Sequence, residues 1–269
     1  MILLRFRSVV AAMLLLGAAG CSTGGNDSDG KETDDRDAKA DPLAGAPKIG
    51  SCYRLTEEDY YGISTEAEPV ECDGRQNSFV YHVGRLEVGS GETPGTFARR
   101  ECRSRLPVTV GLSPARLPST TFDIAAFQPS AAQHADGAAW YRCDLVAHGR
   151  QWALSALPEG APPYYAGGRL PDRYLACVDA DIPNNRGVPC NQPHTHRWFR
   201  SFEGPAVMPT TDELRTFAQR CETLVPTPSW YATWPQERDW IAGLNRISCY
   251  ADDAAGDPPG VTPSPPAPA

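Results

Sequence analysis

The sequence predicts an α+β fold of two tandem related small modules, each a short antiparallel sheet with a helix, stapled by disulfides. Three observations carry this prediction: two matching sets of cysteines, shared motifs around them, and strand and helix patterns that recur in one order. Apart from Cys21, the cysteines form two sets of four: Cys52, Cys72, Cys102 and Cys143, then Cys177, Cys190, Cys221 and Cys249.

The spacing within the two cysteine sets repeats along the chain. The second and third cysteines are 30 residues apart in the first set and 31 in the second. Pro129 and Pro235 each precede the fourth cysteine of their set by 14 residues, and Gly137 and Gly243 share one offset between them. An internal duplication explains these matches together.

Each repeat has the pattern strand, helix, strand. The β-rich segments Phe79–Val88 and His196–Phe202 predict the first long strand of each repeat. In the second repeat an acidic start followed by Leu214 and Phe217 at helical spacing predicts a helix that ends near the third cysteine. The other expected elements are a helix over Gly95–Leu106 and closing strands over Trp140–Val146 and Arg246–Tyr250.

The first residues are those of an export signal. Arg5 and Arg7 precede a short apolar run, which makes residues 1–20 a signal peptide, and the run is shorter than the ~20 residues that span a bilayer. The segment Ala18-Ala19-Gly20-Cys21 resembles the lipobox of bacterial lipoproteins, with alanine where leucine is commoner at the first position. This resemblance implies that Cys21 carries the lipid, palmitate included, and that the protein is anchored at the extracytoplasmic face of the cell membrane.

Composition divides the remainder of the chain. Residues 21–47 are rich in Asp and poor in large apolar side chains, so an acidic disordered tether is expected there. Residues 254–269 are rich in Pro and predict a disordered tail. Between them we expect repeat one at 48–157, a Pro- and Gly-rich linker at 158–173 and repeat two at 174–253.

The cysteines of an exported protein are expected to be oxidised. Four cysteines in one module allow three pairings, and local closure favours joining the first with the second and the third with the fourth. A helix that ends at the third cysteine and packs on the strand of the fourth favours the same scheme. The expected disulfides are Cys52–Cys72, Cys102–Cys143, Cys177–Cys190 and Cys221–Cys249.

A metal site is the alternative use of one cysteine. Cys190, His194 and His196 are residue types that suit zinc. The first repeat has Gln76 and Ser78 where the second has these histidines, and Cys190 corresponds to a disulfide cysteine. We therefore expect no metal and no other cofactor.

The net negative charge of the mature chain limits the kinds of partner that it can bind. Removal of residues 1–20 takes away two arginines and no acids, which leaves 23 basic and 33 acidic side chains in the mature chain. A nucleic-acid partner is not expected, because binding to phosphates needs a basic surface.

Catalytic motifs are missing from the sequence. It contains no G-x-S-x-G or H-E-x-x-H motif, so we predict no enzyme and no catalytic residues. The aromatic residues Trp230, Tyr231 and Trp234 are the tentative binding residues, because exposed aromatics bind sugars or protein partners. The alternation of Trp230, Ala232 and Trp234 favours one buried face of a strand instead, and Tyr164-Tyr165 in the linker is expected to be incidental.

The second repeat carries a further resemblance. It contains Val188, Cys190, Pro193 and His194, then Pro235, Trp240, Gly243, Arg246 and Cys249, with Cys177 and Cys221 nearby. This arrangement is similar to the septum-formation domain of actinobacterial envelope proteins. The first repeat keeps Pro129, Gly137 and Cys143 but has Asp73-Gly74-Arg75-Gln76 where the family has Pro-His.

The resemblance to septum-formation proteins implies placement outside the cytoplasm and a link to division, and it implies no catalytic residues. The expected function is a lipid-anchored, non-enzymatic binding protein of the cell envelope, whose partner is an envelope protein or a cell-wall glycan. The alternatives are a cell-wall hydrolase or its regulator, which needs a cleft with paired carboxylates, and a carbohydrate-binding module, which needs Trp230 or Trp234 exposed.

Overall fold

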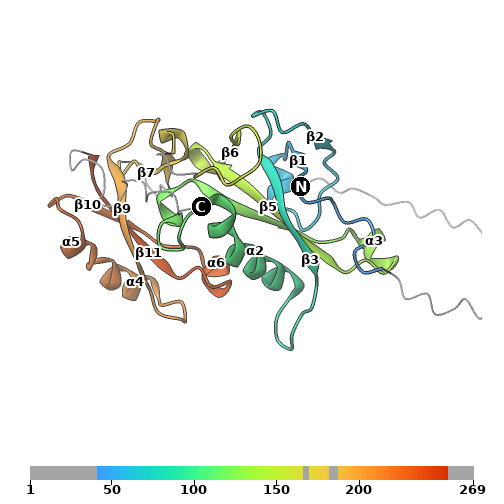
Figure 1. Cartoon of the computed structure of the whole chain (residues 1–269). Helices are drawn as coiled ribbons and strands as arrows, with labels where there is room; N and C mark the ends of the chain where they lie inside the picture. Colours follow the sequence, from blue (N-terminus) through green and yellow to red (C-terminus); the bar gives the residue numbers. More distant parts are fainter. Residues whose placement is uncertain (1–40, 166–169, 182–186, 254–269) are drawn as a thin grey trace, which may run out of the picture. The chain divides into compact units, whose positions relative to one another are not determined.

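The computed structural model describes residues 41–165, 170–181 and 187–253 (Figure 1). The predicted signal peptide, Cys21, residues 22–40 of the tether and the tail 254–269 lie outside the described residues. The first module forms an antiparallel sheet with the strand order β2-β1-β3-β5-β4, and β6 adds to β5. Its strands are β1 (Cys52–Tyr53), β2 (Pro69–Val70), β3 (Ser78–Arg85), β4 (Phe122–Phe127), β5 (Trp140–His148) and β6 (Leu154–Ser155).

The second module repeats this topology strand for strand. Its sheet has the order β8-β7-β9-β11-β10, which is the order of the first sheet once β6 is set aside. The strands are β7 (Ala176–Val178), β8 (Val188–Pro189), β9 (His196–Glu203), β10 (Trp230–Thr233) and β11 (Arg246–Asp252). The predicted α+β class with two similar modules is therefore confirmed.

A β-bulge recurs at the same place in both sheets. In the first sheet Val80 pairs with Asp144 and His82 with Cys143, so the residue between Val80 and His82 has no partner in the register. In the second sheet Cys249 pairs with Arg200 and Tyr250 with Trp198, so the residue between Trp198 and Arg200 has no partner in the register. A bulge bends a strand and increases its twist, so both sheets curl at equivalent positions.

One longer helical segment covers a face of each sheet. In the first module α2 (Pro94–Val110) begins at Thr93, whose hydroxyl accepts from Thr96 N, and ends at Gly111 in the left-handed region. It extends beyond the predicted helix at its C-terminal end. In the second module α4 (Thr211–Ala218) begins with a capping box between Thr210 and Glu213 and leads into α5 (Cys221–Leu224).

Several shorter helices complete the modules. After the fourth strand of each module comes one turn of helix followed by a glycine at positive φ, Gly137 in one and Gly243 in the other. These are α3 (Ala131–Ala135) and α6 (Glu237–Ile241), while α1 (Glu57–Tyr61) follows β1. The 3₁₀ helices are η2 (Leu117–Ser119), η3 (Arg150–Trp152) and η4 (Asp172–Tyr174).

Four disulfides join the eight cysteines in the predicted pairs: Cys52–Cys72, Cys102–Cys143, Cys177–Cys190 and Cys221–Cys249. One detail of the prediction is wrong. The third cysteine does not end its helix: Cys102 lies within α2, and Cys221 begins α5. In both modules the second bridge nevertheless ties the helical segment to the strand of the fourth cysteine, β5 or β11, and the cysteines of these two bridges are fully buried.

Two segments that the sequence assigns to connectors pack on the first module. Residues 41–47, the end of the predicted tether, form a turn held by hydrogen bonds from Ala139 N to Pro42 O at 2.8 Å and from Trp140 Nε1 to Ala44 O at 3.2 Å. In the linker, Tyr165 N donates to Val110 O at 3.2 Å.

The linker tyrosines are not incidental, contrary to expectation. Tyr164 and Tyr165 pack on the hydrophobic core of the first module. The Tyr164 ring lies 5.9 Å from the Phe122 ring, and its hydroxyl donates to Gly160 O at 3.1 Å. Aromatic side chains bury large apolar areas, so these residues extend the core that α2 covers on the same face of the sheet.

Candidate functional site

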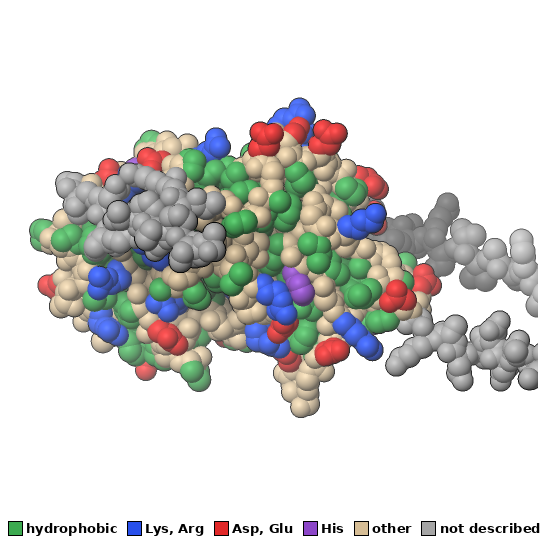
Figure 2. Space-filling model, in the orientation of Figure 1, with side chains coloured by type: hydrophobic (Ala, Val, Ile, Leu, Met, Phe, Trp, Pro, Cys, Tyr) green, Lys and Arg blue, Asp and Glu red, His purple; other side chains and the backbone are tan. Residues whose placement is uncertain are grey.

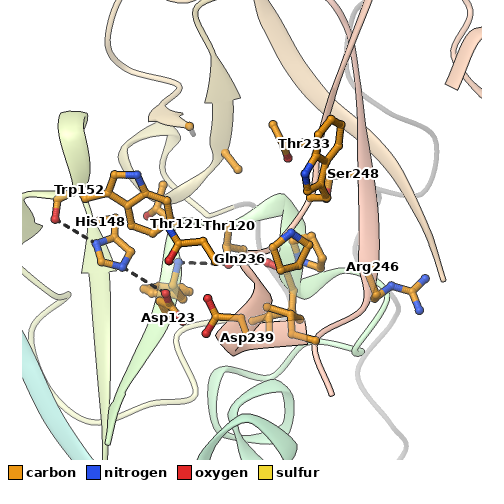
Figure 3. A pocket seen from close by; sticks show the side chains of 18 of the residues that line it. Thr120, Thr121, Asp123, His148, Trp152, Thr233, Gln236, Asp239, Arg246 and Ser248 are labelled. Carbon is orange, nitrogen blue, oxygen red and sulfur yellow. Dashed lines mark hydrogen bonds and ion pairs between the residues drawn. The ribbon is translucent and has the colours of Figure 1, made fainter. Parts of the chain in front are cut away.

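A cleft of about 740 Å³ lies between the two modules (Figure 3). The first module contributes β4, the end of β5 and the loop that follows it, and the second contributes β10, α6 and β11. On β11 the side chains of Arg246, Ser248 and Tyr250 line the cleft, whereas Ile247 and Cys249 pack into the core on the opposite face. Strand alternation thus presents one face of the second sheet to the first module.

His148, at the end of β5, has hydrogen-bonding groups at both ring nitrogens. Its Nε2 lies 3.2 Å from the Tyr60 hydroxyl and 3.3 Å from Asp123 Oδ2. Its Nδ1 lies 3.3 Å from the backbone oxygen of Trp152, and Figure 3 shows the ring held between Asp123 and Trp152. Because partners flank both nitrogens, the orientation of the imidazole is fixed.

Arg103 connects the carboxylates of the two modules. Its Nη1 lies 2.8 Å from Asp123 Oδ1 on β4, and its Nη2 lies 2.9 Å from Asp239 Oδ1 on α6. Arg99, one turn earlier on α2, donates to the same Asp239 oxygen at 3.3 Å. The Arg103 side chain is 10% exposed and the Asp239 side chain 13% exposed, so this contact is largely shielded from solvent.

The ionisation of Asp123 follows from these neighbours. Burial raises the pKa of Asp123, but the Arg103 charge and the hydrogen bond from His148 outweigh it, so the pKa lies well below the ordinary range. Burial likewise raises the pKa of the Tyr60 hydroxyl well above its usual value. These shifts favour the anionic form of Asp123 and the neutral hydroxyl of Tyr60.

This pattern does not suit acid catalysis. A glycosidase needs one carboxyl group that retains its proton near the working pH. Asp123 has a depressed pKa, and Asp239 shares the same arginine. The arrangement suits a fixed ion-pair network that joins the modules and orients His148.

Trp152 forms part of the cleft wall on the side of the first module. It lies in the loop between β5 and β6, and its ring meets the His148 ring edge-on at 4.5 Å between centroids. Its side chain is 36% exposed, so an aromatic face remains open to the cleft.

The aromatic residues that the sequence indicates for binding separate onto two faces of the second sheet. Trp230 and Trp234 are half-buried and pack with Ala232 against the core of the second module, as the alternating pattern indicates. Tyr231 packs on the opposite face with Trp198 and Tyr250. Tyr231 and Trp234 line the inter-module cleft, and Trp230 does not.

The residues of the second repeat's motif have mainly structural roles. Cys190 is bonded to Cys177, Trp240 is buried and donates from Nε1 to Pro205 O at 3.0 Å, and His194 contacts Asp253 at 3.3 Å. Val188, Pro235 and Arg246 of the motif line the cleft, and Arg246 Nε donates to Ser201 Oγ at 3.2 Å.

The zinc alternative finds no support. Because Cys190 forms a disulfide with Cys177, its sulfur is not a zinc ligand. His196 instead has Thr195 Oγ1 and Ser229 Oγ beside its two ring nitrogens, at 2.8 Å and 3.0 Å. Within the described residues no group of three or more His, Cys, Asp or Glu side chains is arranged to hold a metal.

The surface carries charges of both signs. On the face in Figure 2 acidic and basic side chains are interspersed among apolar ones, without a field of one sign. In the part of the chain that the structure describes, no helix has the length and apolar character to cross a bilayer.

The sequence did not indicate Arg103, Asp123, His148, Trp152 or Asp239 as site residues. They come from four separate segments, and no local motif joins them. Trp152 offers the one usable signal, because it is a large aromatic residue in a polar loop that begins at Gly149. Searches against protein-family models, curated proteins and solved structures found no match to this chain, so the similarity to septum-formation domains rests on the motif residues alone.

Proposed function

We propose that this chain is a lipid-anchored, extracytoplasmic, non-enzymatic binding protein whose ligand site is the inter-module cleft. The cleft itself carries the proposal. It has the size of a small-molecule site, a few aromatic walls, and polar groups from both modules that converge on it. A duplicated pair of modules commonly creates its binding site at the boundary between them.

The anchored, exported state is supported by two features. The four disulfides suit an oxidising compartment outside the cytoplasm, and the lipobox-like segment ends at Cys21. Metabolic labelling with a palmitate analogue, followed by membrane fractionation, tests this part. Label and membrane association must both disappear in Cys21→Ser, and label that persists in this variant contradicts the anchor.

The non-enzymatic character is supported by the chemistry of the cleft. Asp123 and Asp239 are both bonded to Arg103. The low pKa of Asp123 does not suit a general acid, which a glycan hydrolase needs in its protonated form. Incubation of the protein with purified cell wall, followed by chromatography of the released fragments, tests this point. Turnover that is abolished by Asp123→Asn would favour the hydrolase instead.

Occupation of the cleft is tested by blocking it. Thr233 on β10 lines the cleft and is half-buried, so Thr233→Trp fills the space. Thr216 on α4 is exposed and lies outside the cleft lining, so Thr216→Trp is the matched control. With protein-free fragments of digested envelope, saturation-transfer NMR should detect binding to the soluble Cys21→Ser protein and to the control, and none to Thr233→Trp. Equal transfer to all three proteins contradicts the site.

A role at the division septum is part of the proposal and rests on the resemblance of the second repeat to septum-formation domains. Imaging a fluorescent fusion at the C-terminal tail in dividing cells tests it, with Cys21→Ser as the control. Enrichment at septa that requires Cys21 supports the role, and uniform envelope signal contradicts it.

A further inference from the structure

We propose that the inter-module cleft binds a neutral saccharide, with sugar rings placed against Trp152 and the Tyr231–Trp234 wall. This inference rests on the proposed function, because it specifies the ligand of the same cleft. Three features of the cleft carry it: aromatic faces contributed by both modules, carboxylates that are already paired with arginines, and hydrogen-bonding groups between the two walls.

The aromatic faces come from opposite modules. Trp152 belongs to the β5–β6 loop of the first module, while Tyr231 and Trp234 belong to β10 and the residue after it in the second. All three line the cleft and none is fully buried. A pyranose ring presents C–H groups on its flat faces and hydroxyls at its edge, so it stacks on aromatic faces while its rim remains polar.

The placement of Trp152 is maintained against the preference of the backbone. Gln151 and Trp152 have φ values of 56° and 66°, and they are the non-glycine residues at positive φ in the described part of the chain. The left-handed region is disfavoured for such residues. The contacts of Trp152 with His148 hold the loop there, and strain of this kind concentrates at binding sites.

The loop that carries Trp152 is closed by a short pair of strands. Here β6 pairs with β5 through Ala147–Ser155 and His148–Leu154. Among the described residues the second module has no strand equivalent to β6.

The charges in the cleft favour an uncharged ligand. Asp123 and Asp239 are both bonded to Arg103, and Arg238 lies 3.8 Å from Asp239. Arg246 donates to Ser201 Oγ at 3.2 Å. Both carboxylates are therefore paired with arginines, so a cationic ligand would meet no unmatched acid. Arg246 has only neutral partners on Ser201, but in Figure 3 its guanidinium points away from Gln236 and Asp239. The space between the aromatic walls thus suits a sugar better than an ionic ligand.

Polar groups between the walls suit hydroxyls. Gln236 lies between the Trp152–His148 side and the Thr233–Ser248 side of the cleft (Figure 3). A primary amide offers both donors and an acceptor, which matches a hydroxyl that does both. Removal of Gln236 should therefore weaken binding without disturbing the aromatic walls.

The test is isothermal titration of the soluble Cys21→Ser protein with three neutral probes. These are a linear tetramer of N-acetylglucosamine, a linear tetramer of glucose, and a tetrapeptide with blocked ends. We expect at least one sugar to bind, and the pair distinguishes an N-acetylated glycan from a plain hexose chain. Trp152→Ala and Gln236→Ala should each weaken this binding about tenfold, the loss of one stacking or polar contact.

Phe217→Ala is the matched control, because Phe217 is 37% exposed on α4 and lies outside the cleft. It should bind sugar as the parent does, and thermal unfolding checks that every variant is folded. Sugar binding that is unaffected by Trp152→Ala overturns the inference. Binding of the tetrapeptide alone, lost in Trp152→Ala, overturns the saccharide but retains the cleft. Binding of no probe also overturns the saccharide, and the blocking experiment with Thr233→Trp then decides on the cleft.

Discussion

Arg103 on α2 of the first module lies 2.9 Å from Asp239 on α6 of the second, while its other terminal nitrogen holds Asp123. The guanidinium thus joins two carboxylates from different modules in a largely buried setting. A second contact connects the modules nearby, where Thr121 N donates to Tyr174 O at 3.0 Å. The two repeats therefore pack as one compact unit rather than as two independent domains joined by a linker.

Replacing Arg103 should destabilise the fold strongly. Arg103→Met removes the charge but keeps much of the apolar length. It leaves Asp123 without its arginine, and it leaves Asp239 with only the longer contacts to Arg99 and Arg238. Loss of one partner from a buried ion pair costs about 3–5 kcal/mol, measurable as a lower free energy of unfolding in urea. Arg105→Met is the control: its pair with Glu101 is 39% exposed at the arginine and should contribute less than about 1 kcal/mol. Equal effects would contradict a buried network.

Acid should unfold the protein partly through Asp123. The folded-state pKa of Asp123 is depressed, so its stabilisation is fully present above the unfolded value of about 3.9 and is lost as pH falls through the folded value. The parent should therefore lose stability between about pH 5 and pH 3 more steeply than Asp123→Asn. Asp59 and Glu101, whose pKa values are also lowered, remain in both proteins. The free energy of unfolding of both proteins is measured by chemical denaturation across this pH range. An equal loss with falling pH in the parent and in Asp123→Asn would exclude the effect.

The disulfides should differ in their contribution according to the chain they enclose. Cys102–Cys143 closes a separation of 41 residues and Cys177–Cys190 one of 13. Loop-closure entropy gives roughly 4 and roughly 3 kcal/mol for these bridges. Replacement of both cysteines of a bridge by alanine should therefore lower the free energy of unfolding more for Cys102–Cys143. A reversed order would show that strain or packing outweighs loop length.

Gly243 should resist substitution for conformational reasons alone. It ends α6 with φ at +87°, and a Cβ there would meet no atom within 4 Å. Gly243→Ala should nevertheless lower stability by about 1–2 kcal/mol, because the left-handed region disfavours a side chain. Gly89 also has open space around it but lacks a positive φ, so Gly89→Ala should be nearly neutral. Calorimetric melting of both variants checks this difference.

The repeat architecture was accessible from the sequence because it leaves local signals. The cysteine spacing predicted the four bridges, and Pro129, Pro235 and their glycines marked equivalent turns. The long strands follow from β-rich segments and appear as β3 and β9 with small shifts at their ends. The strand pairs β1–β2 and β7–β8 were not predicted, because strands of two or three residues have too few positions to show alternation.

Other features could not be predicted, since they depend on contacts between distant segments. Arg142 and Asp144 on β5 look like solvent-facing residues, yet both are buried and bonded to one another at 2.6 Å. The Arg142 guanidinium lies 4.1 Å from the centre of the Tyr53 ring. A hydrophobicity pattern assigns such charges to water, and only tertiary pairing reverses the assignment. The cleft was missed for the same reason.

Hydrogen exchange of the soluble protein, with and without the envelope fragments, tests most directly whether the ligand site lies between the modules. We predict slower exchange in residues 148–153 and in residues 231–236 together, since these segments line the cleft from opposite modules. Protection confined to one module, or located on the face of the sheets away from the cleft, would contradict this prediction.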